Sequence, residues 1–358
     1  MEYIRSSSEL HEQGLYAELE AYKYHVFLDF REVQDNEWHQ YSQLATFLSG
    51  RGVPNIEEAL KEIFLRPIHH PFRELVNPGQ FEWLIRNRIE SEETEPAQLE
   101  KALDEVESKA GELFQEIIRF IQGAGEASAI SHEIRQETDA LLRLPQLSSR
   151  FPLPRSRKYK SAQIYLLEGP GGQSFGTNPL QTGDSGVWGT LLGWLFTHKL
   201  GEAGGGDDSA GQSRSWIDEW LLGKILATTL QDMGLSEEIA WQAVGVNKLL
   251  INHQSWYQKL LTKKEGAHLV LEPWLEDLEV QRYLQINRHQ GILWFNKETF
   301  EELLWWMFAI SAIQISADSE DSSVARKILD CYGIVQDLLK AEAASDYQVE
   351  KLLAAAGG

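Results

Sequence analysis

Two short segments of the chain place asparagine, histidine and glutamine next to tryptophan, a combination that suits sugar recognition. They are NHQSW, at 252–256, and NRHQGILW, at 287–294. Indole rings can stack on the faces of pyranose rings while amide and imidazole groups bond sugar hydroxyls. A sugar platform built in this way would use Asn252, His253, Trp256, Asn287, His289 and Trp294. The alternative, which we favour from the sequence, is that these polar groups satisfy one another or helix ends inside a helical bundle.

Paired carboxylates are the second chemistry that the chain could carry. Glycoside hydrolysis in a helical cleft requires two acids about 5–10 Å apart in an open groove. The candidate acids are Asp218, Glu219, Asp277 and Glu298. Glu298, however, begins an expected helix, where a carboxylate already interacts favourably with the helix dipole. A helical carbohydrate-active enzyme therefore stays open as an alternative.

Other familiar sites do not match the sequence. The GxxxxG spacing at Gly171–Gly176 is followed by Thr-Asn, whereas a phosphate loop requires Lys and then Ser or Thr. His69 and His70 are adjacent, unlike the spaced pair of an HExxH zinc site. We therefore expect no metal ion, no cofactor and no catalytic residue of a known motif.

Composition restricts the class of partner. The chain has 358 residues and a formal net charge of −21, a field that disfavours nucleic acid and anionic membrane surfaces. Its single cysteine, Cys331, excludes an internal disulfide framework, and the first residues do not resemble a signal peptide. Both features predict a cytoplasmic protein. The longest apolar run, 303–313, is too short to span a bilayer and predicts a buried helix.

The elements that must position these residues begin with two alternating segments, Leu15–Glu20 and Tyr22–Phe30, which predict a β-hairpin turning near residues 20–21. One face of the second segment carries Tyr22, Tyr24, Val26, Leu28 and Phe30. A lone hairpin is marginally stable, so this face needs a cover. The cover could be internal, from a helix at 34–49 or a third strand at Ala162–Leu167, or it could be a sheet supplied from elsewhere.

Nearly all of the remaining sequence has helical spacing. Expected helices cover 34–49, 56–64, 81–89, 96–120, 130–144, 187–200, 297–315 and 323–344, and others begin at residue 216, after Ser236 and after Pro273. Two prolines are expected to break the segment RPIHHPFREL at 66–75, and the glycine-rich segment GEAGGGDDSAGQSR at 201–214 is expected to be mobile. The predicted fold is mainly α, an N-terminal β-hairpin followed by a multi-helix domain. The expected divisions are 1–33, 34–144, a Gly/Pro-rich connection at 145–186, and a Trp-rich helical part at 187–358.

The opening text GLYAELEAYKYHVFLDFREV, at 14–33, resembles the closing strands of the small β-domain that follows the catalytic barrel in α-amylase-type glycoside hydrolases of family 13. The later stretches GRGVPNIEEAL, PFRELVN, SWIDEWLLGKI and ILWFNKETFEELLWW are similar to a helical C-terminal extension of some bacterial members. The resemblance implies the C-terminal portion of something longer, a non-catalytic accessory region that packs on or positions a catalytic barrel of a parent protein or subunit, with α-glucan as the associated substrate.

The family's catalytic acids cannot be assigned to this chain. The local patterns that mark its aspartate nucleophile, glutamate acid/base and third aspartate are absent from the sequence. The resemblance therefore implies that any hydrolysis would occur on another part of the parent protein. A third hypothesis is a scaffold or oligomerisation module whose hairpin adds to the edge of a partner's sheet.

Overall fold

The computed structural model describes residues 1–15, 21–22, 24–37, 39–88, 96–146, 157–172, 184–258, 267–318 and 323–357. Over these ranges the protein is mainly helical, and its one sheet is a two-stranded antiparallel hairpin of β1 (Asn287–His289) and β2 (Ile292–Trp294). The predicted mainly α class is thus confirmed, although this small hairpin is not the N-terminal one that the sequence predicted. The chain forms two compact units, Met1–His70 and Pro71–Gly358, each of which is described by itself. The finer division at residues 33, 144 and 186 stays a prediction.

The first unit contains α1 (Ser7–Gln13), α2 (Gln40–Leu48), α3 (Ile56–Phe64) and the start of α4. Glu2 and Val53 exchange backbone hydrogen bonds, which ties the first residues to the α2–α3 connection. The side chain of Asn55 accepts a hydrogen bond from the Glu58 backbone N–H at 3.0 Å and so caps α3.

The strand predicted over Tyr22–Phe30 is wrong, because residues 24–30 form no strand. Most of the other predicted strand, residues 16–20, lies outside the described residues. Ala21 and Tyr22 do form a turn. A strand is stabilised by pairing with a neighbour, and residues 24–30 make no backbone hydrogen bond to any other described residue.

The segment 66–75 is a continuous helix, α4 (Arg66–Leu75), although the sequence predicted that Pro67 and Pro71 would break it. Pro67 is the second residue of the helix, where a backbone N–H has no partner within the helix. Pro71 lacks only the helical hydrogen bond from its own backbone nitrogen to the carbonyl four residues earlier. Ile68 and Phe72 are fully buried at helical spacing, and this burial outweighs the lost bond.

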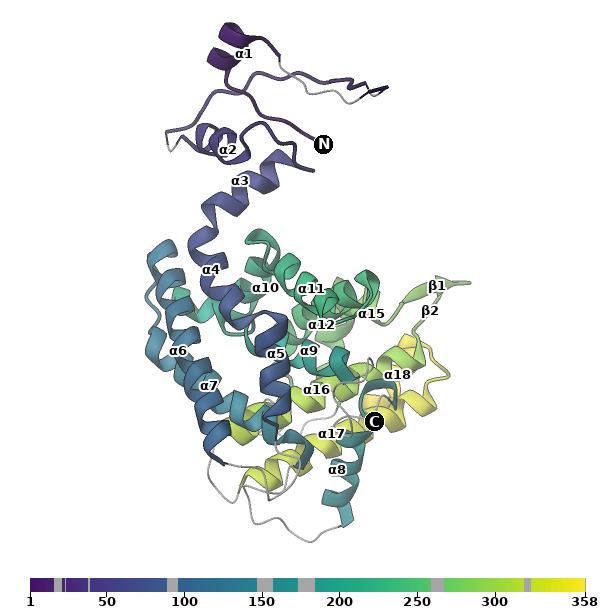
Figure 1. The fold of residues 1–358 in the computed structure, drawn as a ribbon. Coiled ribbons are helices and arrows are strands. Elements are labelled where there is room, and N and C mark those ends of the chain that lie inside the picture. The colour runs from purple at the N-terminus through teal and green to yellow at the C-terminus, as the bar shows by residue number, and fades with distance from the viewer. Residues whose placement is uncertain are drawn as a thin grey trace. The chain divides into compact units, whose positions relative to one another are not determined.

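The second unit is a helical assembly (Figure 1). Its elements are α5 (Pro78–Arg86), α6 (Pro96–Ile121), α7 (Ala127–Arg143), η1 (Leu144–Gln146), α8 (Arg157–Glu168), η2 (Pro170–Gly172), α9 (Asp184–Leu195), η3 (Leu200–Gly204), α10 (Ser209–Glu219), α11 (Leu222–Asp232), α12 (Glu237–His253), α14 (His268–Glu276), α15 (Leu278–Tyr283), α16 (Lys297–Asp318), α17 (Val324–Ala344) and α18 (Val349–Gly357).

Helices α6 and α7 lie side by side in the second unit, as Figure 1 shows. The apolar stripe predicted for 96–120 faces inward, and its buried members are Leu99, Leu103, Val106, Ala110, Leu113 and Ile117. Helix α16 packs against α7, α8, α17 and η2 and forms the centre of the core. Its run from residue 303 to 313 is buried as predicted, including Trp305, whose indole Nε1–H donates to the carbonyl of Leu166 in α8 at 3.1 Å.

The predicted strand Ala162–Leu167 is wrong, because these residues belong to helix α8. The alternation within six residues is too short to exclude a helix. Over the whole helix the buried side chains are Tyr159, Ala162 and Leu166, which lie three and four residues apart. This spacing places them on one helical face.

The glycine-rich segment 201–214, predicted to be mobile, forms η3 and the first turns of α10. The side chain of Asp208 caps α10 by accepting a hydrogen bond from Gly211 N–H at 3.0 Å. Helix α10 therefore begins at Ser209, earlier than the predicted start at residue 216. Likewise, the helix predicted after Pro273 begins at His268 and contains that proline.

Candidate functional site

Three of the six predicted sugar-binding residues gather at the end of α12, around Asp277. Asn252 Nδ2 donates to Asp277 Oδ2 at 2.6 Å, and His253 Nε2 lies 3.0 Å from the same oxygen. Asp277 Oδ1 accepts from the Glu279 backbone N–H and so caps α15. Trp256 donates its indole N–H to the carbonyl of Met307 at 3.1 Å. These side chains connect α12, α15 and α16.

The electrostatics of this group suit a structural role. Burial alone would raise the pKa of Asp277, but hydrogen bonds from the Glu279 backbone and from Asn252 and His253 lower it overall. The pKa of His253 is lowered, chiefly by burial, although Asp277 opposes this. The Asp277 carboxylate and the His253 ring are therefore held in charged and neutral form, respectively, near neutral pH.

The candidate acids of a paired-carboxylate enzyme are engaged elsewhere. Asp218 pairs with Lys248 at 2.8 Å, and Glu219 accepts a hydrogen bond from the hydroxyl of Ser215 at 2.7 Å. Asp277 is the cap of α15. Glu298 lies in the first turn of α16. Asp218, Glu219 and Asp277 thus each have a partner that accounts for the position of the carboxylate.

The other three predicted residues lie on the β1–β2 hairpin. Asn287 pairs with Trp294 across the two strands, and the turn contains Gln290 and Gly291, both with positive φ. Asn287 and His289 are exposed, whereas Trp294 is half-buried. Among the described residues, no hydrogen bond or ring contact joins this trio to the trio at the end of α12, so the structure does not assemble the six into one platform.

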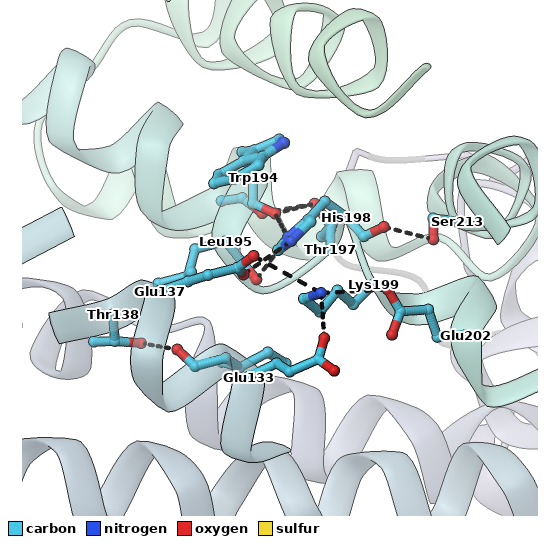
Figure 2. Close-up of polar contacts among 12 residues, drawn as sticks. Glu133, Glu137, Thr138, Trp194, Leu195, Thr197, His198, Lys199, Glu202 and Ser213 are labelled. Atoms are coloured by element: carbon cyan, nitrogen blue, oxygen red, sulfur yellow. Dashed lines mark hydrogen bonds and ion pairs between the residues drawn. The ribbon is translucent and has the colours of Figure 1, made fainter. Parts of the chain in front are cut away.

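A polar cluster that the sequence did not predict, buried only at Glu137 and His198, lies between α7 and the residues that follow α9 (Figure 2). It consists of Glu133, Glu137, His198, Lys199 and Glu202. The signal that could have found it is a His-Lys pair at the end of an apolar helix, together with glutamates four residues apart on an otherwise amphipathic helix.

The first unit exposes a row of large apolar side chains, which we call the apolar strip: Tyr24, Val26, Leu28 and Phe30. Their exposed fractions are 84%, 68%, 78% and 74%, and Tyr22 just before them is fully exposed. Between them, the half-buried Phe27 packs edge-on against Tyr3 with ring centroids 5.6 Å apart. The backbone is therefore anchored through one side chain while the strip faces solvent.

The apolar strip places a large apolar side chain at every second position of residues 24–30. Residues 24–30 make no backbone hydrogen bond to another described residue. Asp29 has a left-handed φ of 58°, so a regular strand conformation does not continue from Leu28 to Phe30. Exposed apolar rows of this kind mark interaction surfaces in soluble proteins.

Across the described ranges, no helix is both long and apolar enough to cross a membrane. Within the same ranges, no three His, Cys, Asp or Glu side chains are grouped so that they could hold a metal ion. Comparisons of the chain with protein-family models, with curated proteins and with solved structures gave no match.

Proposed function

We propose that this chain is a non-catalytic accessory module that binds through its apolar strip, adding an edge strand to the β-domain of an α-amylase-type, α-glucan-acting protein. The observation that carries the proposal is the exposure of Tyr24, Val26, Leu28 and Phe30. A surface of four large apolar side chains in a row costs free energy in water. A partner that covers the row recovers this free energy.

Strand addition is the binding mode that fits the strip best. In this mode the main chain bonds the open edge of a sheet, and alternate side chains enter apolar pockets. The strip carries large side chains at every second position, and its backbone makes no hydrogen bond to the other residues that the structure describes. Phe27, which contacts Tyr3, would keep the segment attached to the first unit during binding.

The class of partner comes from the resemblance of residues 14–33 to the last hairpin of the β-domain in that family. The chain would then complete a β-layer beside the catalytic barrel. The barrel would belong either to the same polypeptide or to a different protein. The roles of the carboxylates support a non-catalytic module, because Asp218, Glu219 and Asp277 all serve the helical assembly.

The test is a binding experiment with the full chain and a recombinant α-amylase-type protein whose β-domain has been shortened by its last hairpin. We expect calorimetry to detect binding to the shortened protein and none to the intact protein, whose sheet edge is already occupied. Val26→Asp should abolish the binding, since it places a charge in the middle of the strip.

Three outcomes would contradict the proposal. The first is equal binding to the shortened and intact proteins, and the second is binding that Val26→Asp leaves unchanged. The third is a dimer of the chain alone that Val26→Asp dissociates, because the occupant of the strip would then be a second copy. Independently, release of reducing sugar from starch or glycogen by the purified chain would refute the non-catalytic assignment.

A further inference from the structure

The apolar strip is attached to the rest of the first unit through a row of ring contacts. Phe27 packs edge-on against Tyr3, with ring centroids 5.6 Å apart, and His25 stacks on Phe27 at 6.2 Å. The guanidinium group of Arg5 lies 6.0 Å from the centroid of the Tyr3 ring, within the range of a cation–π contact. Tyr3 is therefore the residue at which the row meets the first residues of the chain.

The backbone on one side of Tyr3 is bound to the α2–α3 connection. Glu2 donates its backbone N–H to the carbonyl of Val53 at 2.6 Å and accepts from the Val53 N–H at 2.8 Å. Its carboxylate also accepts a hydrogen bond from the backbone N–H of Ile56, the first residue of α3, at 2.7 Å. Tyr3 is thus fixed relative to the start of α3.

The other side of Tyr3 is held by Arg5. Its Nη2 donates to the carbonyl of Gly50 at 2.9 Å. Gly50 has a φ of 86°, in the left-handed region that favours glycine, and an added Cβ there would lie 3.2 Å from the guanidinium nitrogens. We call residues 2–5 the N-terminal clamp, because Glu2 and Arg5 bind the α2–α3 connection on both sides of Tyr3.

Gly52 provides the surface on which the Tyr3 ring lies. A Cβ added to Gly52 would lie 2.7 Å from Cε1 and Cζ of Tyr3, and the three heavy atoms nearest to it all belong to that ring. The φ of Gly52 is not in the left-handed region, so its backbone accepts alanine without strain. Gly52→Ala must therefore act by displacing the Tyr3 ring.

We infer that Tyr3 is a positioning residue for the apolar strip, and that it holds Phe27 so that the opposite face of residues 24–28 is offered to the partner. Residues 24–30 make no backbone hydrogen bond to another described residue, so side-chain contacts must fix their orientation. Phe27 is half-buried, whereas Tyr24, Val26 and Leu28 are exposed. A strip that is already oriented avoids part of the entropy cost of binding. The inference rests on the proposed function for its partner, but the positioning itself is a property of the free chain.

The direct test is nitrogen-15 relaxation of residues 24–28 in the free full chain. We expect backbone order parameters above about 0.6 in the parent chain, and values below about 0.6 in Gly52→Ala and in Tyr3→Leu. Tyr3→Phe keeps the ring and should keep the order. Unchanged order parameters in both Gly52→Ala and Tyr3→Leu would overturn the inference.

A double variant shows whether Gly52 acts through Tyr3. In Tyr3→Leu the ring atoms that the new methyl group would meet are gone, so adding Gly52→Ala should cause no further loss of order. An equal further loss would contradict the inference, since Gly52 would then act by another route. The amide signals of α2 and α3 are the folding control. If Gly52→Ala shifts them, the comparison of Tyr3→Leu with Tyr3→Phe decides, and loss of order in both would overturn the inference.

Binding to the shortened α-amylase-type protein gives the functional readout. Gly52→Ala should weaken it by about threefold to tenfold in Kd, the contribution of one aromatic pair. Phe47→Leu, at an exposed side chain that is not part of the strip, should leave Kd unchanged. Equal Kd values for the parent chain and Gly52→Ala would contradict the inference. No binding by the parent chain would refute the proposed function alone, because the relaxation data decide the positioning of the strip without a partner.

Discussion

Gly123 lies where the turn between α6 and α7 meets η3, and it leaves no room for a side chain. A methyl group added there would overlap the backbone carbonyl oxygen of Ala203. The same carbonyl accepts a hydrogen bond from Gly125 N–H at 3.1 Å, and Gly204 accepts one from Ala124 N–H at 3.4 Å. Because the obstacle is backbone rather than a rotatable side chain, Gly123→Ala must separate the two segments.

The expected cost follows from these contacts. The two hydrogen bonds are worth about 1–3 kcal/mol together, and forced displacement in a packed region costs about 1–3 kcal/mol. Alanine returns about 0.4–1 kcal/mol by restricting the unfolded chain. We therefore expect Gly123→Ala to lower the free energy of unfolding of the second unit by about 3 kcal/mol.

Gly245 is the matched control, in the same unit and subject to the same substitution. It lies on the exposed side of α12, and nothing lies within 4 Å of an added Cβ. Gly245→Ala should therefore stabilise the unit by about 0.5–1 kcal/mol, the helix preference of alanine over glycine.

Urea unfolding followed by far-UV circular dichroism, with hydrogen exchange of α6 and α7 as a local readout, measures both variants. A free energy of unfolding of Gly123→Ala within about 0.5 kcal/mol of the parent chain, the usual range for a neutral surface change, would contradict the predicted backbone overlap. Destabilisation by Gly245→Ala would contradict it as well, because an added methyl group would then cost free energy even where no atom lies near it.

Three further predictions rest on single contacts. Leu28→Ala removes three carbons from a side chain that is 78% exposed. In the calorimetric assay it should weaken partner binding by about 2 kcal/mol, which is about 30-fold in Kd. The control is Phe47→Ala, at an exposed side chain of the same unit that is not part of the strip, and it should leave Kd unchanged. Trp305→Phe removes the indole donor to the carbonyl of Leu166, which still accepts from Gly169 N–H at 3.2 Å, and should cost about 0.5–1.5 kcal/mol, seen as faster exchange in α8. Because the pKa of Asp277 is lowered in the folded protein, the carboxylate stabilises the fold above about pH 3.9, and this stabilisation is lost as the pH falls through the folded-state pKa. Asp277→Asn should therefore reduce the fall in the free energy of unfolding at acidic pH. An unchanged fall would show that other acids produce it.

The long helices can be predicted from the sequence because their apolar periods extend over many turns. Helix α6, with a stripe from Leu99 to Ile117, ends within one residue of its predicted C-terminal end. Ser236 is recognisable as a helix cap because its hydroxyl accepts a hydrogen bond from the backbone N–H of Ile239, only three residues later. Such signals involve only residues that are close together in the sequence, so they can be read from the sequence alone.

The errors arise where distant contacts decide the local structure. Ala162–Leu167 alternates like a strand, but its burial is set by α16 and α17. The glycines at 201–206 have the composition of a flexible linker, yet Gly201 allows its backbone to approach that of Ser209 closely. The candidate site shows the same limit: the tryptophan motifs are visible in the sequence, whereas the pairing of Glu137 with His198 joins residues far apart in it.

The central position of α16 has a consequence for synthesis of the chain. The helix occupies residues 297–318, yet it packs against α7, α8 and η2, which leave the ribosome much earlier. Until α16 emerges, the faces of these elements that contact α16 lack their native cover, and such surfaces favour aggregation. Contacts between distant positions also slow folding. The nascent second unit should therefore depend on chaperones until nearly its whole length has been translated.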